Sequence, residues 1–232
     1  MVEQLLRQHA VWRGGAPQPG LPAIPTGYPA LEGELPGGGW PSAGLTEILS
    51  GPRGIGELQL VLPALASLTW SGKRVVWIAP PHLPYAPALA AAGVDLAQLV
   101  VVRAPGRRDS LWAAEQALRA GCSHAVLAWL GRASYDELRR LALAAESGPA
   151  WVALFRPREA ASDASPACLR LALEPVGDAL GVQILKRRGA PAAAPLLLPV
   201  KRPVHALGRA PLSVPAAGGS AADRRLGLPV HA

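Results

Sequence analysis

The stretch LSGPRGIGEL, residues 49–58, lies where an α/β nucleotide-binding protein would carry its phosphate loop. The strand-like run LTEILS (45–50) leads into it, and the helix-like run QLVLPALASLTW (59–70) follows it. Three glycines fall at the first, fourth and sixth positions of such a loop, namely Gly51, Gly54 and Gly56. The stretch is therefore either a retained anion-binding turn or a relic that persists because the turn needs glycine conformations.

Four groups that phosphoryl transfer requires are replaced in this sequence. Glu57 takes the position of the phosphate-binding Lys and would repel phosphate, and Leu58 offers no oxygen to Mg²⁺. The resemblance to the RecA recombinase core, carried by the motifs quoted below, implies that Trp129 stands where the metal-supporting Asp should end a strand and that Pro81 stands where a catalytic Glu should be. One lost charge-assisted hydrogen bond alone costs about 1.5–3 kcal/mol. We therefore expect no catalytic residue, no bound cofactor, no metal ion and no enzyme activity.

Beyond this stretch, buried-strand patterns alternate with helical ones. Continuous apolar runs typical of parallel strands occupy residues 74–79, 99–104, 124–129 and 150–155. Helical patterns separate them, which predicts βαβ units, hence an α/β fold with a mostly parallel central sheet flanked by helices. Two later runs, 167–174 and 181–188, predict an antiparallel hairpin at the sheet edge, and LLLPV (196–200) offers one last strand.

Local signals mark the ends of several helices. Ser134 and Glu137 form the pattern of a capping box at the start of a helix that ends before Gly148. Asp109 is placed to cap a helix over residues 110–121. Pro63 is expected to kink the helix that follows LSGPRGIGEL.

Composition and charge indicate a folded, cytoplasmic protein with a basic C-terminal part. The 232 residues are 50% hydrophobic, and we find neither a signal-like start nor an apolar run of membrane-spanning length. Cys122 and Cys168 make no disulfide framework. Residues 1–185 are neutral, so the whole net charge of +7 lies beyond them. Such a tail either meets an anionic partner or is a solvated extension that aids solubility.

Two groups of residues are candidates for partner contact. A basic patch for phosphate or DNA is expected at Lys186, Arg187, Arg188, Lys201 and Arg202, with an exposed, solubilising strand end as the alternative. Residues 2–12 read as a short amphipathic helix on a Gly/Pro-rich connector, with Leu5 and Trp12 on its apolar side. Trp40 is either a second aromatic anchor or a structural residue. We expect Trp77, Trp129 and Trp151 in the core and Trp112 on a helix face against the sheet.

Several motifs together carry a family resemblance. The entry IPTG (24–27), the turn GGGWP (37–41) and the strand running into SGP (50–52) resemble the start of the RecA recombinase core. The blocks LLRQHAVWRG, LEGELPGGGWPSAGLTEIL, SGPRGIGELQL and LKRRG resemble ImuA, a RecA-related family that is also related to the SulA division inhibitors. The resemblance implies a RecA-like P-loop NTPase-type core at residues 24–188 with a degenerate loop. An N-terminal helix and linker (1–23) would precede this core, and a basic, largely disordered tail (189–232) would follow it.

The same resemblance implies a role in DNA damage. It predicts a non-catalytic, SOS-induced accessory protein of mutagenic translesion DNA synthesis, which acts as an adaptor for the Y-family-like polymerase homologue ImuB. RecA, the error-prone polymerase III alpha subunit, DNA and a second copy of the chain are further candidate partners. Such a protein would be cytoplasmic, nucleoid-associated when engaged, and would have no membrane partner. The alternative is a SulA-like inhibitor that binds the division protein FtsZ.

Overall fold

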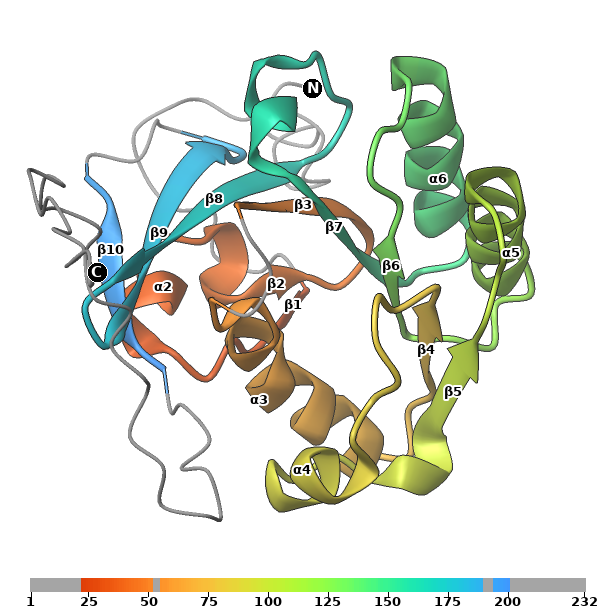
Figure 1. The fold of residues 1–232 in the computed structure, drawn as a ribbon, viewed down its shortest axis with the longest axis horizontal. Helices are drawn as coiled ribbons and strands as arrows, with labels where there is room; N and C mark the ends of the chain where they lie inside the picture. The colour runs from red at the N-terminus through yellow and green to blue at the C-terminus, as the bar shows by residue number, and fades with distance from the viewer. Residues whose placement is uncertain (1–21, 52–54, 190–193, 201–232) are drawn as a thin grey trace, which may run out of the picture. The chain divides into compact units, whose positions relative to one another are not determined.

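A computed structural model describes residues 22–51, 55–189 and 194–200. Eight strands form one sheet in the order β10-β9-β8-β3-β7-β6-β4-β5 (Figure 1). All pairs from β8 to β5 are parallel, whereas β9 is antiparallel to both β8 and β10. In chain order the strands are β3 (Gly44–Ser50), β4 (Val75–Ile78), β5 (Leu99–Val102), β6 (Ala125–Trp129), β7 (Trp151–Pro157), β8 (Leu169–Val176), β9 (Ala179–Lys186) and β10 (Leu196–Pro199).

Helices cover both faces of this sheet and bury two hydrophobic clusters. One cluster lies under α3 and α4, and the other lies under α5 and α6 (Figure 1). Because each parallel strand is covered on both sides, the apolar runs of the sequence are continuous rather than alternating. The helices are α2 (Pro29–Glu32), α3 (Glu57–Trp70), α4 (Ala86–Ala91), α5 (Arg107–Arg119) and α6 (Tyr135–Ser147), with short 3-10 turns η1 (Pro36–Gly38), η2 (Leu96–Gln98) and η3 (Arg158–Ser162).

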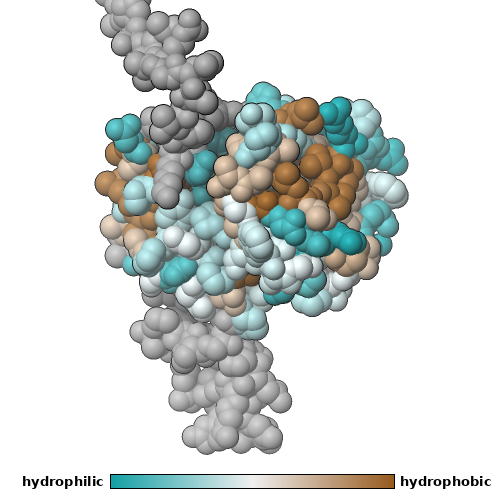
Figure 2. Space-filling view, turned by 90° about the horizontal axis from the view of Figure 1, so that it is seen from below, coloured by the Kyte–Doolittle hydropathy of each residue, from teal (hydrophilic) through white to brown (hydrophobic). Residues whose placement is uncertain are grey.

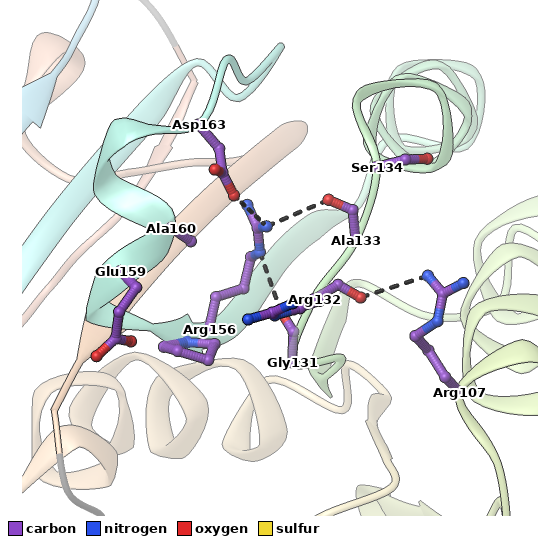
Figure 3. Close-up of a pocket in the computed structure, with 10 residues that line it drawn as sticks. Arg107, Gly131, Arg132, Ala133, Ser134, Arg156, Glu159, Ala160 and Asp163 are labelled. Carbon is purple, nitrogen blue, oxygen red and sulfur yellow. Dashed lines mark hydrogen bonds and ion pairs between the residues drawn. The ribbon is translucent and has the colours of Figure 1, made fainter.

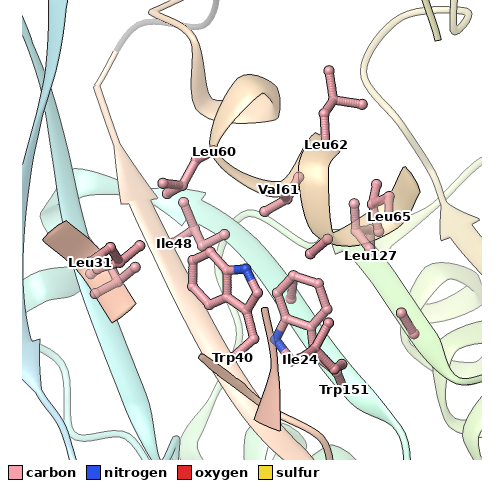
Figure 4. Close-up of a cluster of buried hydrophobic side chains, with 14 of the residues drawn as sticks. Ile24, Leu31, Trp40, Ile48, Leu60, Val61, Leu62, Leu65, Leu127 and Trp151 are labelled. Carbon is pink, nitrogen blue, oxygen red and sulfur yellow. The ribbon is translucent and has the colours of Figure 1, made fainter. Parts of the chain in front are cut away.

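Two stacked tryptophans anchor the N-terminal part of the core. Trp40 lies in the small strand β2 (Trp40–Pro41), which pairs with β1 (Ala23–Ile24), and its ring stacks on Trp151 at a centroid distance of 5.0 Å (Figure 4). The indole N–H of Trp151 donates to the hydroxyl of Thr46 at 3.1 Å. Both rings are fully buried, so Trp40 is a structural residue and cannot anchor a partner.

The structure confirms the core positions predicted for Trp77 and Trp129 and contradicts the position predicted for Trp112. Trp77 and Trp129 contact each other edge to face within the cluster under α3, as expected of core residues. Trp112, predicted to face the sheet, is exposed instead. The buried stripe of α5 runs through Leu111, Ala114 and Leu118, and position 112 lies off that stripe because a helix turns 100° per residue.

Pro63 lies inside α3, and the chain compensates for it. A proline cannot donate to the carbonyl four residues earlier, so the carbonyl of Gln59 lacks its helical donor. The hydroxyl of Tyr28 donates to this carbonyl at 2.9 Å. Gly27, in the left-handed region at φ 80°, lies against the proline ring, where an added Cβ would come within 2.5 Å of Pro63 Cβ. The proline is therefore a docking point for the turn before α2.

The ends of α5 and α6 test the capping predictions. Ser134 caps α6, and Glu137 completes the capping box by accepting from the backbone N–H of Ser134 at 2.8 Å, which confirms that prediction. The prediction for α5 is wrong: the helix begins at Arg107 with Gly106 as its N-cap, and Asp109 lies in its first turn. An acidic side chain there still stabilises the helix dipole, which explains the misleading signal.

The fold prediction needs two corrections. The hairpin formed by β8 and β9 is present but is not at the sheet edge, because β10 pairs outside it and extends the sheet beyond Arg188. The RecA-like P-loop NTPase-type core is also wrong, as the comparison with known families in the next subsection shows. Among the described residues, no helix is long and apolar enough to cross a membrane.

Candidate protein interface

The described end of the turn after β3 contacts other parts of the chain. Gly56 is the N-cap of α3 at φ 101°, and a Cβ added there would lie 3.4 Å from the side chain of Val200, just beyond β10. Leu58 packs against the hydrophobic cluster under α3. Glu57 is the first helical residue, so its carboxylate already provides the negative charge that a helix N-terminus favours. Gly51 is exposed, and Gly54 lies outside the described residues.

A cleft of about 780 Å³ opens at the carboxyl ends of β6 and β7, beside the N-termini of α5 and α6 (Figure 3). Its polar wall is built around Arg156 of β7, which is almost fully buried. The guanidinium of Arg156 donates to the carbonyls of Gly131 and Ala133 and to the carboxylate of Asp163, at 3.2–3.3 Å. The cleft is therefore braced by internal hydrogen bonds.

Behind the cleft, a buried carboxylate holds two arginines. Glu47 of β3 is fully buried and accepts from Arg156 and Arg170, each at 2.5 Å. Arg170 of β8 also donates to the carbonyl of Ala160 at 2.6 Å and thereby ties η3 to the sheet. A buried carboxylate is tolerated only when it is paired and hydrogen-bonded, as here. The cluster links three strands and one turn, which is a structural role.

An ion pair between α5 and α6 lies at the rim of the cleft. At its rim, the exposed Arg107 pairs with Glu137 at 2.6 Å. Burial would raise the pKa of Glu137, but hydrogen bonds from Ser134 and Arg107 outweigh it and hold that pKa below its usual value. Within the part of the chain that the structure describes, no three His, Cys, Asp or Glu side chains come together as metal ligands.

The basic strand end is largely engaged within the chain. Lys186 donates to the carbonyl of Ser165 at 2.9 Å, and Arg187 pairs with the carboxylate of Glu34 at 2.7 Å. Arg188 is exposed. The remaining candidates lie outside the described residues, namely Lys201, Arg202, Leu5 and Trp12. The basic patch expected from the sequence therefore stays a prediction, with Lys186 and Arg188 exposed at the end of β9.

A hydrophobic surface lies around α4 and β5, on the face seen from below in Figure 2. Leu83, Tyr85 and Leu96 are exposed there, and Leu83 and Leu96 border an apolar groove of about 480 Å³ between α4 and β5, the α4 groove. Val100 and Val101 continue the apolar surface along β5. Sequence reasoning missed this surface, because the run LVVV resembles any buried strand until its place in the sheet is known.

These features define an α/β protein with Glu57 at the start of α3 and an exposed apolar surface around α4 and the edge strand β5. The family model described as "Cell division inhibitor SulA" matches residues 47–152. Protein ImuA of Caulobacter vibrioides is 33% identical over 133 residues, 54% of this chain and 53% of that protein. Cell division inhibitor SulA of Yersinia pestis is 30% identical over 113 residues, 49% of this chain and 67% of that protein.

A solved structure of SulA from Pseudomonas aeruginosa is 29% identical and covers 48% of this chain and 97% of that chain, with a TM-score of 0.43. The chain belongs to the SulA family, to which ImuA is related, and the resemblance to ImuA seen in the sequence is confirmed. Since the family that matches is SulA, the RecA-like NTPase prediction is overturned. The matches span 53% to 67% of the length of these curated relatives.

Proposed function

We propose that this protein is a non-catalytic adaptor of the bacterial SOS response that acts through protein contacts in mutagenic translesion DNA synthesis. One observation supports the non-catalytic part: Glu57 begins α3 at the position of the phosphate-binding Lys, and the side chain of Val200 lies beside Gly56. Bound phosphate would meet an apolar side chain and a carboxylate instead of a lysine. The relation to ImuA supports the assignment to translesion synthesis.

The partner in this proposal is an ImuB-type polymerase homologue, with RecA and the error-prone polymerase III alpha subunit as further members of the complex. The α4 groove supports a protein partner, because exposed apolar surface rimmed by polar residues is typical of interaction sites. DNA contact would fall to Arg188 with Lys201 and Arg202, and it should weaken steeply with salt. The protein would then act in the cytoplasm, at the nucleoid when engaged.

Division inhibition is the second candidate function, favoured by the family model over residues 47–152. This range includes α3, α4 and β5, and therefore the whole α4 groove. In this case the groove would bind FtsZ in place of a polymerase homologue. The two functions thus share a surface and differ in the partner.

A paired binding and cell assay separates these functions. The full-length chain is used as bait for the ImuB-type homologue and for FtsZ, alongside Leu83→Glu in the α4 groove and Trp112→Glu on α5 as an exposed apolar control. We expect capture of the ImuB-type homologue, its loss only in Leu83→Glu, and a reduced damage-induced mutation frequency in cells carrying that variant. If the bait captures FtsZ alone and overexpression makes cells filamentous, the adaptor function is rejected in favour of division inhibition.

A further inference from the structure

A pocket of about 320 Å³ lies at the amino ends of β3 and β8, next to the C-terminal end of α6, and is called the β3 pocket below. Its walls are mostly apolar and include Leu45 at the start of β3, Ala142 of α6 and Leu169 at the start of β8. It shares no lining residue with the cleft around Arg156 or with the α4 groove. The β3 pocket is therefore a separate site.

Hydrogen bonds within the chain hold the walls of the β3 pocket in place. The N–H of Ser42 donates to the carbonyl of Pro22 at 3.3 Å, and the N–H of Cys168 donates to the carbonyl of Leu45 at 3.0 Å. Gly44 lies between Ser42 and Leu45 at φ 117°, and a Cβ added there would lie 3.2 Å from the sulfur of Cys168. Glycine thus leaves room in front of the thiol. A pocket formed in advance lowers the ordering cost of binding.

Two charges of opposite sign line the β3 pocket without pairing. Within the described part of the chain, the side chains of Arg188 and Glu146 form no ion pair or hydrogen bond, and both are exposed. Arg187, which also lines the pocket, is engaged by the carboxylate of Glu34 at 2.7 Å. Both unpaired charges reach the thiol of Cys168: burial raises its pKa, Arg188 lowers it and Glu146 raises it. They therefore lie on two sides of one small space.

Glu146 is placed where it does not stabilise its own helix. It lies in the last turn of α6, where the helix carbonyls already carry partial negative charge. That turn contains no basic residue to offset the carboxylate. A positive group from outside the chain would neutralise both the carboxylate and the end of the helix. We therefore expect a cation on the Glu146 side of the pocket and an anion on the Arg188 side.

We infer that the β3 pocket binds a linear peptide segment of a partner protein, which places one apolar side chain in the pocket between an acidic and a basic neighbour. The acidic neighbour pairs with Arg188 and the basic one with Glu146. A pocket of this size suits a single large side chain as anchor, with charged groups at the rim. A nucleic acid would bring only negative charge, which Glu146 would repel. The inference goes beyond the proposed function, because this pocket is apart from the α4 groove.

The first test measures binding of synthetic peptides to the full-length protein by fluorescence anisotropy. The probe is a fluorescein-labelled heptapeptide in which one leucine stands between an aspartate and a lysine, with glycines at both ends. We expect saturable binding at submillimolar concentration, its loss when glycine replaces the leucine, and no competition by an equal concentration of free leucine. Absence of saturable binding would overturn the inference. Competition by free leucine would also overturn it, because a small zwitterion would then be the ligand.

Charge exchange tests the two rim residues. Arg188→Glu should weaken binding of the probe at least about fivefold, because repulsion replaces attraction, and a probe with lysine on both sides of the leucine should restore it. Glu146→Lys should be restored in the same way by aspartate on both sides, without a fall in melting temperature, because a cation suits the end of α6. Arg139→Glu, exposed on α6 outside the pocket, is the matched control and should bind the original probe like the parent protein. Failure of both rescues would refute the inference.

The thiol of Cys168 shows whether the probe occupies this pocket. In a Cys122→Ser background, saturating probe should slow alkylation of Cys168 by iodoacetamide at least about threefold, and the glycine-substituted peptide should not. Binding with an unchanged alkylation rate would place the peptide elsewhere and refute the inference. Leu83→Glu in the α4 groove should bind the probe like the parent protein, and Glu146→Lys should leave capture of the ImuB-type homologue intact. Failure of one proposal can therefore be told from failure of the other.

Discussion

The substitution Glu47→Gln removes a buried negative charge while keeping the size of the side chain. In the structure Glu47 is fully buried and accepts from Arg156 and Arg170, whose side chains are 1% and 9% exposed. Without the carboxylate, the buried Arg170 loses the carboxylate it pairs with, and Arg156 keeps only the half-exposed Asp163 at 3.2 Å. Removing one partner of a buried ion pair costs about 3–5 kcal/mol. Because Gln keeps one amide oxygen as an acceptor, we expect the lower end of that range.

A matched control is present in the same chain. Glu115 of α5 also bridges two arginines, Arg119 at 2.7 Å and Arg140 at 2.6 Å, but their side chains are 64% and 61% exposed. After Glu115→Gln both arginines can be solvated, so the cost should be under about 1 kcal/mol. The two substitutions are chemically identical and differ in the burial of the partner arginines.

The assay is thermal unfolding of both variants beside the parent protein, with urea unfolding for the free energies. At about 2–4 °C per kcal/mol for a chain of this size, Glu47→Gln should lower Tm by about 6–12 °C and Glu115→Gln by at most about 4 °C. If the two variants lose the same small amount, the buried cluster does not hold η3 and the three strands together. The reasoning about this part of the fold would then be refuted.

Three further predictions concern single groups. Tyr28→Phe removes the donor to the Gln59 carbonyl and should cost about 1 kcal/mol, measured by urea unfolding; no loss would show that water replaces the hydroxyl. Burial raises the pKa of the Cys168 thiol, whereas Cys122 is exposed. Iodoacetamide at pH 8 should therefore label Cys122 at least about tenfold faster than Cys168, as followed by mass spectrometry. Equal labelling rates would contradict the burial of Cys168. The pKa of Glu137 is lowered, so the stabilisation that its carboxylate gives the fold is present above the unfolded pKa and is lost as pH falls through the folded pKa. Glu137→Gln should therefore reduce the loss of stability below about pH 4.5. The same loss of stability at acid pH in both proteins would contradict this.

Sequence reasoning located most elements because they depend on local patterns. The runs at 74–79 and 124–129 became β4 and β6, and the capping box at Ser134 appeared as predicted. These signals come from hydrophobic periodicity and from hydrogen bonds between near neighbours, which the sequence displays directly. The capping prediction for Asp109 was wrong because an acidic residue near the start of a helix is favourable both as the N-cap and within the first turn.

The errors in fold class and site came from long-range pairing. The glycines of LSGPRGIGEL suggested a P-loop, but the packing of Val200 against Gly56 joins positions 144 residues apart, and no local pattern reveals it. Likewise, Glu47 meets Arg156 and Arg170 only after three strands align. The exposure of Val100 required the strand order, because LVVV at an edge and LVVV in the middle of a sheet read alike.

The most direct test of the central claim is titration of the purified full-length protein with Mg²⁺ and ATP, followed by phosphate release and by calorimetry. The account predicts neither steady release of phosphate nor heat of binding at millimolar nucleotide, because the carboxylate of Glu57 at the start of α3 repels phosphate and Val200 lies beside Gly56. Steady phosphate release that disappears in Gly56→Val would contradict it and restore a nucleotide site to the turn after β3.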